Sequence, residues 1–229
     1  MPSPTATQAT QILSISTALL ASGGIATLSL FDIPLLKSQP ASRSLPMTRW
    51  LFSRGSHIFP TAAAVSSSGF AYLAYSALPA SSRTLSAFLH HATKGTVGLY
   101  VAAAVLTISI APWTTLAMIP TNFTLIKLNE QLGGTRSAKS AEYRQTKAAE
   151  DPNKMPGGWD RSAEDSVDGK DDVNQWFDLS PPQERTRKES SKKQDEEVRE
   201  LLEKFKALNW ARAVLMGVGG VVGLSAALA

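Results

Sequence analysis

The sequence predicts an all-α protein, a four-helix transmembrane bundle with a long, mostly disordered polar loop between its third and fourth helices. Two observations predict this fold. Apolar blocks of membrane-spanning length alternate with polar connections, and one connection, residues 133–194, is much longer and more charged than the others. The mean hydropathy of −0.06 hides this pattern, because it averages long apolar blocks with a very polar one.

The first apolar block, Ile12 to Phe31, has no charged side chain before or within it and supplies the roughly 20 residues that cross a hydrocarbon core. A secretory signal peptide is the alternative, because ALLASGG resembles a cleavage region. The span is favoured, since no Lys or Arg precedes the block and the block continues to Leu36. The second block, Ile58 to Leu78, is rich in small residues that allow close helix packing in lipid, and Pro79 is expected to end it.

The third block, Gly95 to Ile119, is the most hydrophobic and continues into the stretch APWTTLAMIPTNFTLIKLNEQL. The fourth block, Ala213 to Ala229, has only about 17 residues, so it spans the membrane if Trp210 and Arg212 lie at the interface.

Two further patterns concern the C-terminal part of the chain. Gly219 and Gly223 have G-x-x-x-G spacing, a weak signal for close helix packing. Between Asp195 and Leu208, apolar residues recur at helical spacing, which predicts an amphipathic helix that leads directly into the fourth span.

Composition therefore divides the chain into three parts: helices one to three in 1–132, the charged loop in 133–194, and the amphipathic lead-in with helix four in 195–229. The loop has few apolar side chains to bury, which is typical of disorder. For its aromatic islands GGWD and NQWFDL, stray solvated aromatics are favoured over contact with the membrane surface or with a partner.

Basic residues in the connections predict the orientation. They concentrate in the first connection and at both ends of the third, whereas the second carries only Arg83 and Lys94. The positive-inside rule then places residues 133–194 in the cytoplasm and both termini on the other side. The membrane is expected to be an endomembrane such as the ER or vesicles. The first connection carries Lys37, Arg43, Arg49 and Arg54.

Several polar residues are expected to meet on one side of the membrane, because the ends of spans one and three and the starts of spans two and four share that side. Pro120 is expected to weaken or end the third helix just before Thr121, which turns the Asn122 amide toward neighbouring helices. Each residue alone also fits a helix cap or an interfacial charge, and their convergence makes a functional site as plausible as these roles. The residues are Asp32, His57, Thr121, Asn122, Asn209 and Arg212.

Other site classes lack their sequence signatures. The chain has no Cys, and its three His residues form no H-x-x-x-H or H-E-x-x-H motif, so no zinc, haem or iron site is expected. No phosphate-binding or dinucleotide fingerprint is present, and no basic module with interleaved aromatics predicts nucleic-acid binding. An enzyme of this sequence is expected to work without a bound cofactor.

The segments SLFDIPLL, APWTTLAMIPTN and LNWARAVLMGVGGVVGL resemble the fungal anthrone oxygenase family, which groups with a domain family long labelled as of unknown function. The resemblance covers residues 10–132 and 200–229, and the polar loop looks like an insertion. It implies a multi-pass membrane monooxygenase of secondary metabolism that oxidises an anthrone-type aromatic polyketide to the anthraquinone. Molecular oxygen would be the co-substrate, without flavin or metal.

The resemblance also implies roles for individual residues. An anthrone has an acidic CH₂ beside its carbonyl, so its oxidation needs a base, donors to the developing oxyanion and a dry pocket. His57 is expected to be the base, Arg212 and Asn122 to hold the anthrolate oxygen, and Asp32 to orient His57 or neutralise Arg212. The residues expected to bind substrate are Trp113, Thr114, Thr121, Asn209 and Arg49.

The expected partners are a hydrophobic aromatic small molecule and the lipid bilayer, and the sequence names no protein partner for residues 133–194. The alternative function is a non-enzymatic four-span scaffold or accessory subunit that recruits partners through this cytoplasmic loop.

Overall fold

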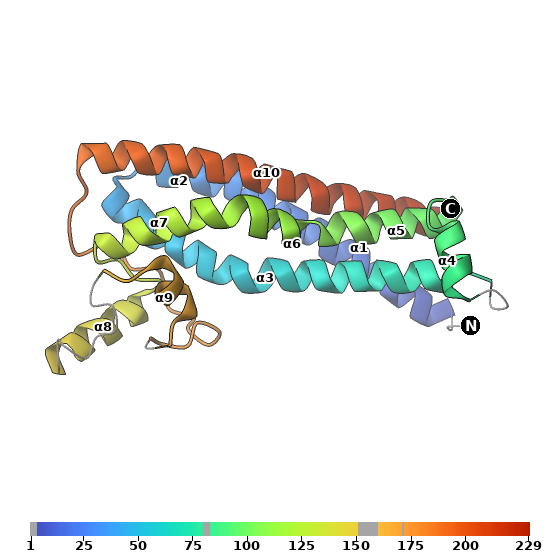
Figure 1. The fold of residues 1–229 in the computed structure, drawn as a ribbon, viewed down its shortest axis with the longest axis horizontal. Helices are drawn as coiled ribbons and strands as arrows, with labels where there is room; N and C mark the ends of the chain where they lie inside the picture. Colours follow the sequence, from blue (N-terminus) through green and yellow to red (C-terminus); the bar gives the residue numbers. More distant parts are fainter. Residues whose placement is uncertain (1–3, 80–82, 151–159, 171) are drawn as a thin grey trace. The chain divides into compact units, whose positions relative to one another are not determined.

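The fold is all-helical, as the sequence predicts. The computed structural model describes residues 4–79, 83–150, 160–170 and 172–229, and these residues contain no strand. Within these described residues, three helical segments are long and apolar enough to cross a membrane: Thr5–Lys37, Gly95–Gln131 and Lys192–Leu228. Figure 1 shows the helices coloured along the chain.

Two of these segments change helix type along their length. The first runs through α1 (Pro4–Thr27), the π-helical turn η1 (Leu28–Asp32) and α2 (Ile33–Lys37). The other consists of α5 (Gly95–Ile108), α6 (Ile110–Trp113), the π-helical turn η3 (Thr114–Met118) and α7 (Ile119–Gln131). The short helix α4 (Leu85–His91) precedes it.

The third segment is the single helix α10 (Lys192–Leu228), which contains both the predicted amphipathic stretch and the predicted fourth span. The apolar side chains of the amphipathic stretch, Val198, Leu202 and Phe205, are buried. The prediction that this stretch leads directly into the fourth apolar block is therefore confirmed.

The helix does not end at Pro120, although its hydrogen-bonding pattern changes there. Pro120 lies in the first turn of α7, directly after the π-helical turn η3. Proline fits this position because first-turn N–H groups have no partner inside the helix. The predicted end of the helix before Thr121 is therefore not observed: the helix changes from π to α at Ile119 and continues through Gln131.

The predicted second span lies in α3 (Ala41–Ser76), which is not among the three apolar segments. Its first half carries Arg43, Arg49 and Arg54, and Ser and Thr dilute the apolar residues of its second half. Three candidate spans are thus present, and the crossing by α3 stays a prediction.

The chain divides into two compact units, each built from several chain segments. Unit 1 comprises Met1–Leu28, Ile58–Thr115 and Asn209–Ala229, and unit 2 comprises Ser29–His57 and Leu116–Leu208. These units cut across the linear division into 1–132, 133–194 and 195–229, because the long helices α3 and α10 contribute to both.

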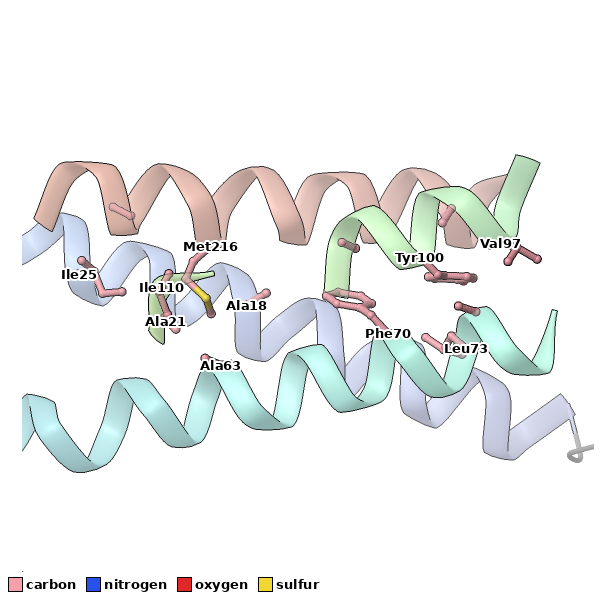
Figure 2. Close-up of a cluster of buried hydrophobic side chains, with 14 of the residues drawn as sticks. Ala18, Ala21, Ile25, Ala63, Phe70, Leu73, Val97, Tyr100, Ile110 and Met216 are labelled. Carbon is pink, nitrogen blue, oxygen red and sulfur yellow. The ribbon is translucent and has the colours of Figure 1, made fainter. Parts of the chain in front are cut away.

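Unit 1 has a core to which four helical segments contribute. Figure 2 shows Ile25 of α1, Phe70 of α3, Tyr100 of α5 and Met216 of α10 among its buried side chains. Glycines allow α10 to approach this core closely: a Cβ atom at Gly223 would lie 2.3 Å from the Phe70 ring.

A Cβ atom at Gly219 would lie 2.7 Å from Thr107 Cγ2. The close packing predicted from the G-x-x-x-G spacing of Gly219 and Gly223 is therefore confirmed.

Unit 2 has its own apolar core and, beside it, buried charges. The Phe52 and Phe205 rings meet edge to face at 5.0 Å, joining α3 to α10. Ile33, Leu45, Met118 and Leu202 are fully buried around them.

The polar segment 133–194 differs from the disordered loop that its composition predicts. Its described residues include α8 (Ala138–Glu150) and α9 (Ala163–Asp168), and α9 lies beside α7 (Figure 1). Arg144 of α8 and Glu130 of α7 form an ion pair at 2.8 Å, with side chains only 2% and 3% exposed. Composition predicts disorder from the shortage of apolar side chains, whereas here ion pairs and hydrogen bonds hold the segment in place.

Candidate functional site

A cavity of about 760 Å³ in unit 2 is the most substantial feature near the predicted site residues. Its volume lies in the range of small-molecule pockets, about 300–1,000 Å³. Much of its wall is apolar, formed by Leu35 at the end of the first helical segment and by Met47 and Trp50 on α3. Asp32 and Arg43 bring opposite charges to this wall.

Asp32 lies where the π-helical turn η1 meets α2, and its side chain makes no capping hydrogen bond to the α2 backbone. The carboxylate instead lines the cavity. A carboxylate among apolar side chains can accept a proton from a bound substrate more readily than one in water, because burial disfavours its charge.

His57 is covered by an aromatic side chain from the polar segment. Its ring stacks on Trp176, with centroids 3.7 Å apart and planes inclined by 26°. Burial, reinforced by the positive charges of Arg54 and Arg136, lowers the pKa of His57 below its ordinary value of 6.5. The imidazole is therefore neutral at pH 7, which is the form that can act as a base.

Arg49 is 3% exposed and is held by the polar segment. Its Nη2 donates to the Ser166 carbonyl oxygen at 2.8 Å, and its Nε donates to Ser166 Oγ at 3.3 Å. Burial, together with the charge of Arg136, lowers the pKa of Arg49 to about 10, so it remains a cation at neutral pH. Some of its donors are thus already engaged inside the protein.

Thr121 and Asn122 lie in the first turn of α7 and carry buried oxygens that the protein does not satisfy. Thr121 is 2% exposed, and neither its Oγ1 nor Asn122 Oδ1 has a hydrogen-bond partner among the described residues. A buried polar atom without a partner typically costs about 1–3 kcal/mol, so such a pair marks a candidate ligand contact.

Arg212 and Asn209 form a pair in unit 1. Arg212 Nη1 donates to Asn209 Oδ1 at 3.1 Å, and the guanidinium lies over the Phe59 ring, 5.4 Å from its centroid. Arg212 is 7% exposed, so its interpretation as a side chain that snorkels outward is wrong.

Trp113 and Thr114 also belong to unit 1. The Thr114 hydroxyl donates to the Ile110 carbonyl of its own helix at 2.7 Å, and Trp113 is 36% exposed. Neither observation identifies a substrate contact, and their predicted role stays a prediction.

The structure thus brings together some of the predicted residues. Asn209 contacts Arg212, Thr121 and Asn122 share a buried helix turn, and Asp32 lines the cavity. Five predicted residues belong to unit 2 and four to unit 1. Those of unit 2 are Asp32, Arg49, His57, Thr121 and Asn122, and those of unit 1 are Trp113, Thr114, Asn209 and Arg212.

Sequence reasoning missed two groups of residues. Arg43, Met47 and Trp50 line the cavity, and their spacing of four and three places them on one helix face, a signal that the sequence already contained. The cover that Trp176 forms over His57 had no such signal, because it joins positions far apart in the chain.

The described residues are helical and include three apolar segments of membrane-spanning length, which is typical of a membrane protein. A model of the family described as "Anthrone oxygenase" matches residues 49–161, slightly less than half of the chain, so this region is similar to that family. The match includes His57 and Asn122 and extends into the polar segment, beyond the limit of 132 expected from the resemblance. No curated protein and no solved structure matches the chain.

Proposed function

We propose that this protein is a membrane-embedded oxygenase that converts an anthrone-type aromatic polyketide to the anthraquinone with molecular oxygen and no bound cofactor. The observation that carries the proposal is the apolar cavity of unit 2 with its carboxylate, in a chain that matches the anthrone oxygenase family. We also propose four spans in an endomembrane, with residues 133–194 on the cytoplasmic side, because basic residues concentrate in the connections on that side.

The cavity suits a flat, apolar substrate that carries one polar oxygen. Trp50 offers an aromatic face for a fused ring system, and Met47 and Leu35 add apolar contacts beside it. Arg43 offers N–H donors to an oxygen that becomes negative as a proton leaves. A substrate of this kind partitions into lipid, so a membrane enzyme can take it from the bilayer.

The reaction balances without another electron donor. A base removes one proton from the CH₂ group, and the resulting anthrolate passes an electron to O₂. Combination of the two radicals forms a C–O bond and, after protonation, a hydroperoxide. Loss of water from the hydroperoxide leaves the second carbonyl. One oxygen atom of O₂ enters the product and the other leaves as water, so a single O₂ takes up all four electrons.

The protein has to supply the base and the oxyanion donors. Asp32 is the first candidate for the base, because it lines the cavity, and neutral His57 is the second candidate. Asn122, which belongs to unit 2, keeps its predicted role as a donor to the anthrolate oxygen, and the role of Arg212 in unit 1 stays a prediction. A scaffold that recruits partners through residues 133–194 is the competing function.

The test compares membranes that contain the protein with membranes that lack it, each given an anthrone under air, with anthraquinone measured over time. An enzyme should raise the rate above the spontaneous oxidation, and Asp32→Asn should lower the enzymatic part by about 10²-fold or more. Glu203→Gln is the matched control, since it removes an exposed carboxylate that pairs with Lys37, and it should change the rate little. Equal rates with and without the protein would favour the scaffold.

A further inference from the structure

The segment Asn174–Ser180, which contains the NQWFDL island, lies along one face of α3. The α3 residues that it contacts are spaced at i, i+3, i+4 and i+7, which is one side of a helix over two turns. The contacts are Trp50 Nε1 to the Ser180 carbonyl at 2.9 Å, Ser53 Oγ to Gln175 Oε1 at 3.4 Å, Arg54 Nη2 to the Asp178 carbonyl, and the His57 ring stacked on Trp176.

A buried aspartate holds the segment in this shape. Asp178 is 5% exposed, and its carboxylate accepts hydrogen bonds from Ser137 Oγ, the Ser180 backbone N–H at 3.0 Å and Ser180 Oγ at 2.6 Å. Asp178 therefore faces inward, which leaves its apolar neighbours on the outside.

Those neighbours are unusually exposed for large apolar side chains. Trp176 is 63% exposed, Phe177 83% and Leu179 85%. Three such side chains within four residues make an exposed apolar patch, and exposed apolar patches mark contact with a partner or a membrane.

The position of the patch along α3 identifies the partner as lipid. Trp176 stacks on His57, and the next residue, Ile58, opens the uncharged block of α3 and is itself 58% exposed. Trp176 therefore contacts α3 one residue before the point at which this helix is proposed to enter the bilayer. Tryptophan is enriched at that level, and Arg54 beside it would favour anionic lipid headgroups.

We propose that Asn174–Ser180 is an interfacial membrane loop, with Trp176, Phe177 and Leu179 inserted between the lipid headgroups and the acyl chains. Its hydrogen bonds to α3 set its depth, and it ties the polar segment to the membrane surface. This inference rests on the proposed crossing of the bilayer by α3.

The absence of cysteine from the chain makes a direct measurement simple. Single cysteines at Phe177→Cys and Leu179→Cys would carry a nitroxide in full-length protein reconstituted in phosphatidylcholine and phosphatidylserine nanodiscs. Accessibility to oxygen, which concentrates in lipid, would be compared with accessibility to a nickel chelate, which stays in water. We expect both sites to be oxygen-accessible and nickel-shielded. Lys170→Cys, at a position 80% exposed, should be nickel-accessible, as a site of similar exposure in water.

A nitroxide at Val65→Cys, within the proposed span of α3, tests the crossing of the bilayer by α3 separately from the insertion of Asn174–Ser180. Nickel access at 177 and 179 with lipid shielding at 65 would overturn the interfacial loop and keep the topology. Nickel access at 65 would overturn both. Shielding of 177 and 179 from both reagents, in a manner that depends on protein concentration in detergent, would show a second copy of the chain on the patch and overturn lipid insertion.

Discussion

At the scale of single residues, substitution of Asn122 tests whether its amide only ends a helix or takes part in catalysis. Its Oδ1 is buried without a hydrogen-bond partner in the described protein, so it caps no backbone N–H. If the amide donates to an anthrolate oxygen, Asn122→Ala should lower the rate of anthrone oxidation by roughly 10²-fold or more at normal protein levels. Asn122→Asp should be at least as damaging, because it places a negative charge beside the anthrolate. Wild-type turnover in Asn122→Ala would remove the residue from the site.

His57 provides a prediction about pH at the same scale. Its folded-state pKa lies below its ordinary value of 6.5, so folding favours the neutral ring. The stability that follows from this is fully present above pH 6.5, and it is lost as the pH falls from 6.5 to the lower folded pKa, because protons then bind the unfolded chain more tightly. The melting temperature of the wild type in detergent should therefore drop more between pH 7.5 and pH 5.5 than that of His57→Gln.

Carboxylates also titrate toward the lower end of this range, so only the difference between the two proteins reports on His57. Equal drops would mean that His57 protonates equally well in the folded and the unfolded protein. A smaller drop in the wild type would mean that folding favours the charged ring, contrary to the effect of Arg54 and Arg136.

At the scale of elements, the approach of α10 to the core of unit 1 depends on glycine. A Cβ atom at Gly223 would lie 2.3 Å from the Phe70 ring, which is itself fully buried. Gly223→Ala should therefore lower the free energy of unfolding by about 1–3 kcal/mol, the usual cost of overpacking a core. Thermal unfolding in detergent measures the change.

Gly23 of α1 is the matched control. Nothing lies within 4 Å of a Cβ atom at that position, so Gly23→Ala introduces no clash. It should be neutral or stabilise by up to about 1 kcal/mol, because alanine is the better helix former. If both substitutions have the same effect, the contact between Gly223 and Phe70 is not a tight one.

The elements also show what the sequence could predict. The apolar segments, the amphipathic part of α10 and the close approach at Gly223 follow from local periodicity and hydropathy, and all were predictable. The burial of Glu130 against Arg144 was not, because each charge is an ordinary surface residue until the other is present. The site divides in the same way: helix ends predicted Asp32 and Asn122, whereas no local pattern pairs His57 with Trp176.

At the scale of the whole molecule, the number of membrane crossings decides on which side each connection lies. Three segments have the length and hydropathy of spans, and α3 is the fourth that we propose. With four spans, Arg83 and Lys94 lie on the side opposite to residues 133–194. If α3 does not cross, Arg83 and Lys94 still lie opposite to residues 133–194, but they then share their side with the basic first connection.

Trypsin added to sealed, cytoplasm-out vesicles distinguishes these arrangements. Lys170 and Arg185 have side chains 80% and 64% exposed, so cleavage is expected there on intact vesicles. Cleavage at Arg83 or Lys94 should require detergent, because the proposed orientation places both in the lumen. Arg43, an exposed residue of the first connection, reports on α3: with four spans it should be cut in the same sealed vesicles as Lys170 and Arg185. If Lys170 and Arg185 are cut and Arg43 is protected, the first connection lies in the lumen with Arg83 and Lys94, and α3 does not cross. Full protection of Lys170 and Arg185, with release of fragments only in detergent, would reverse the orientation of the bundle.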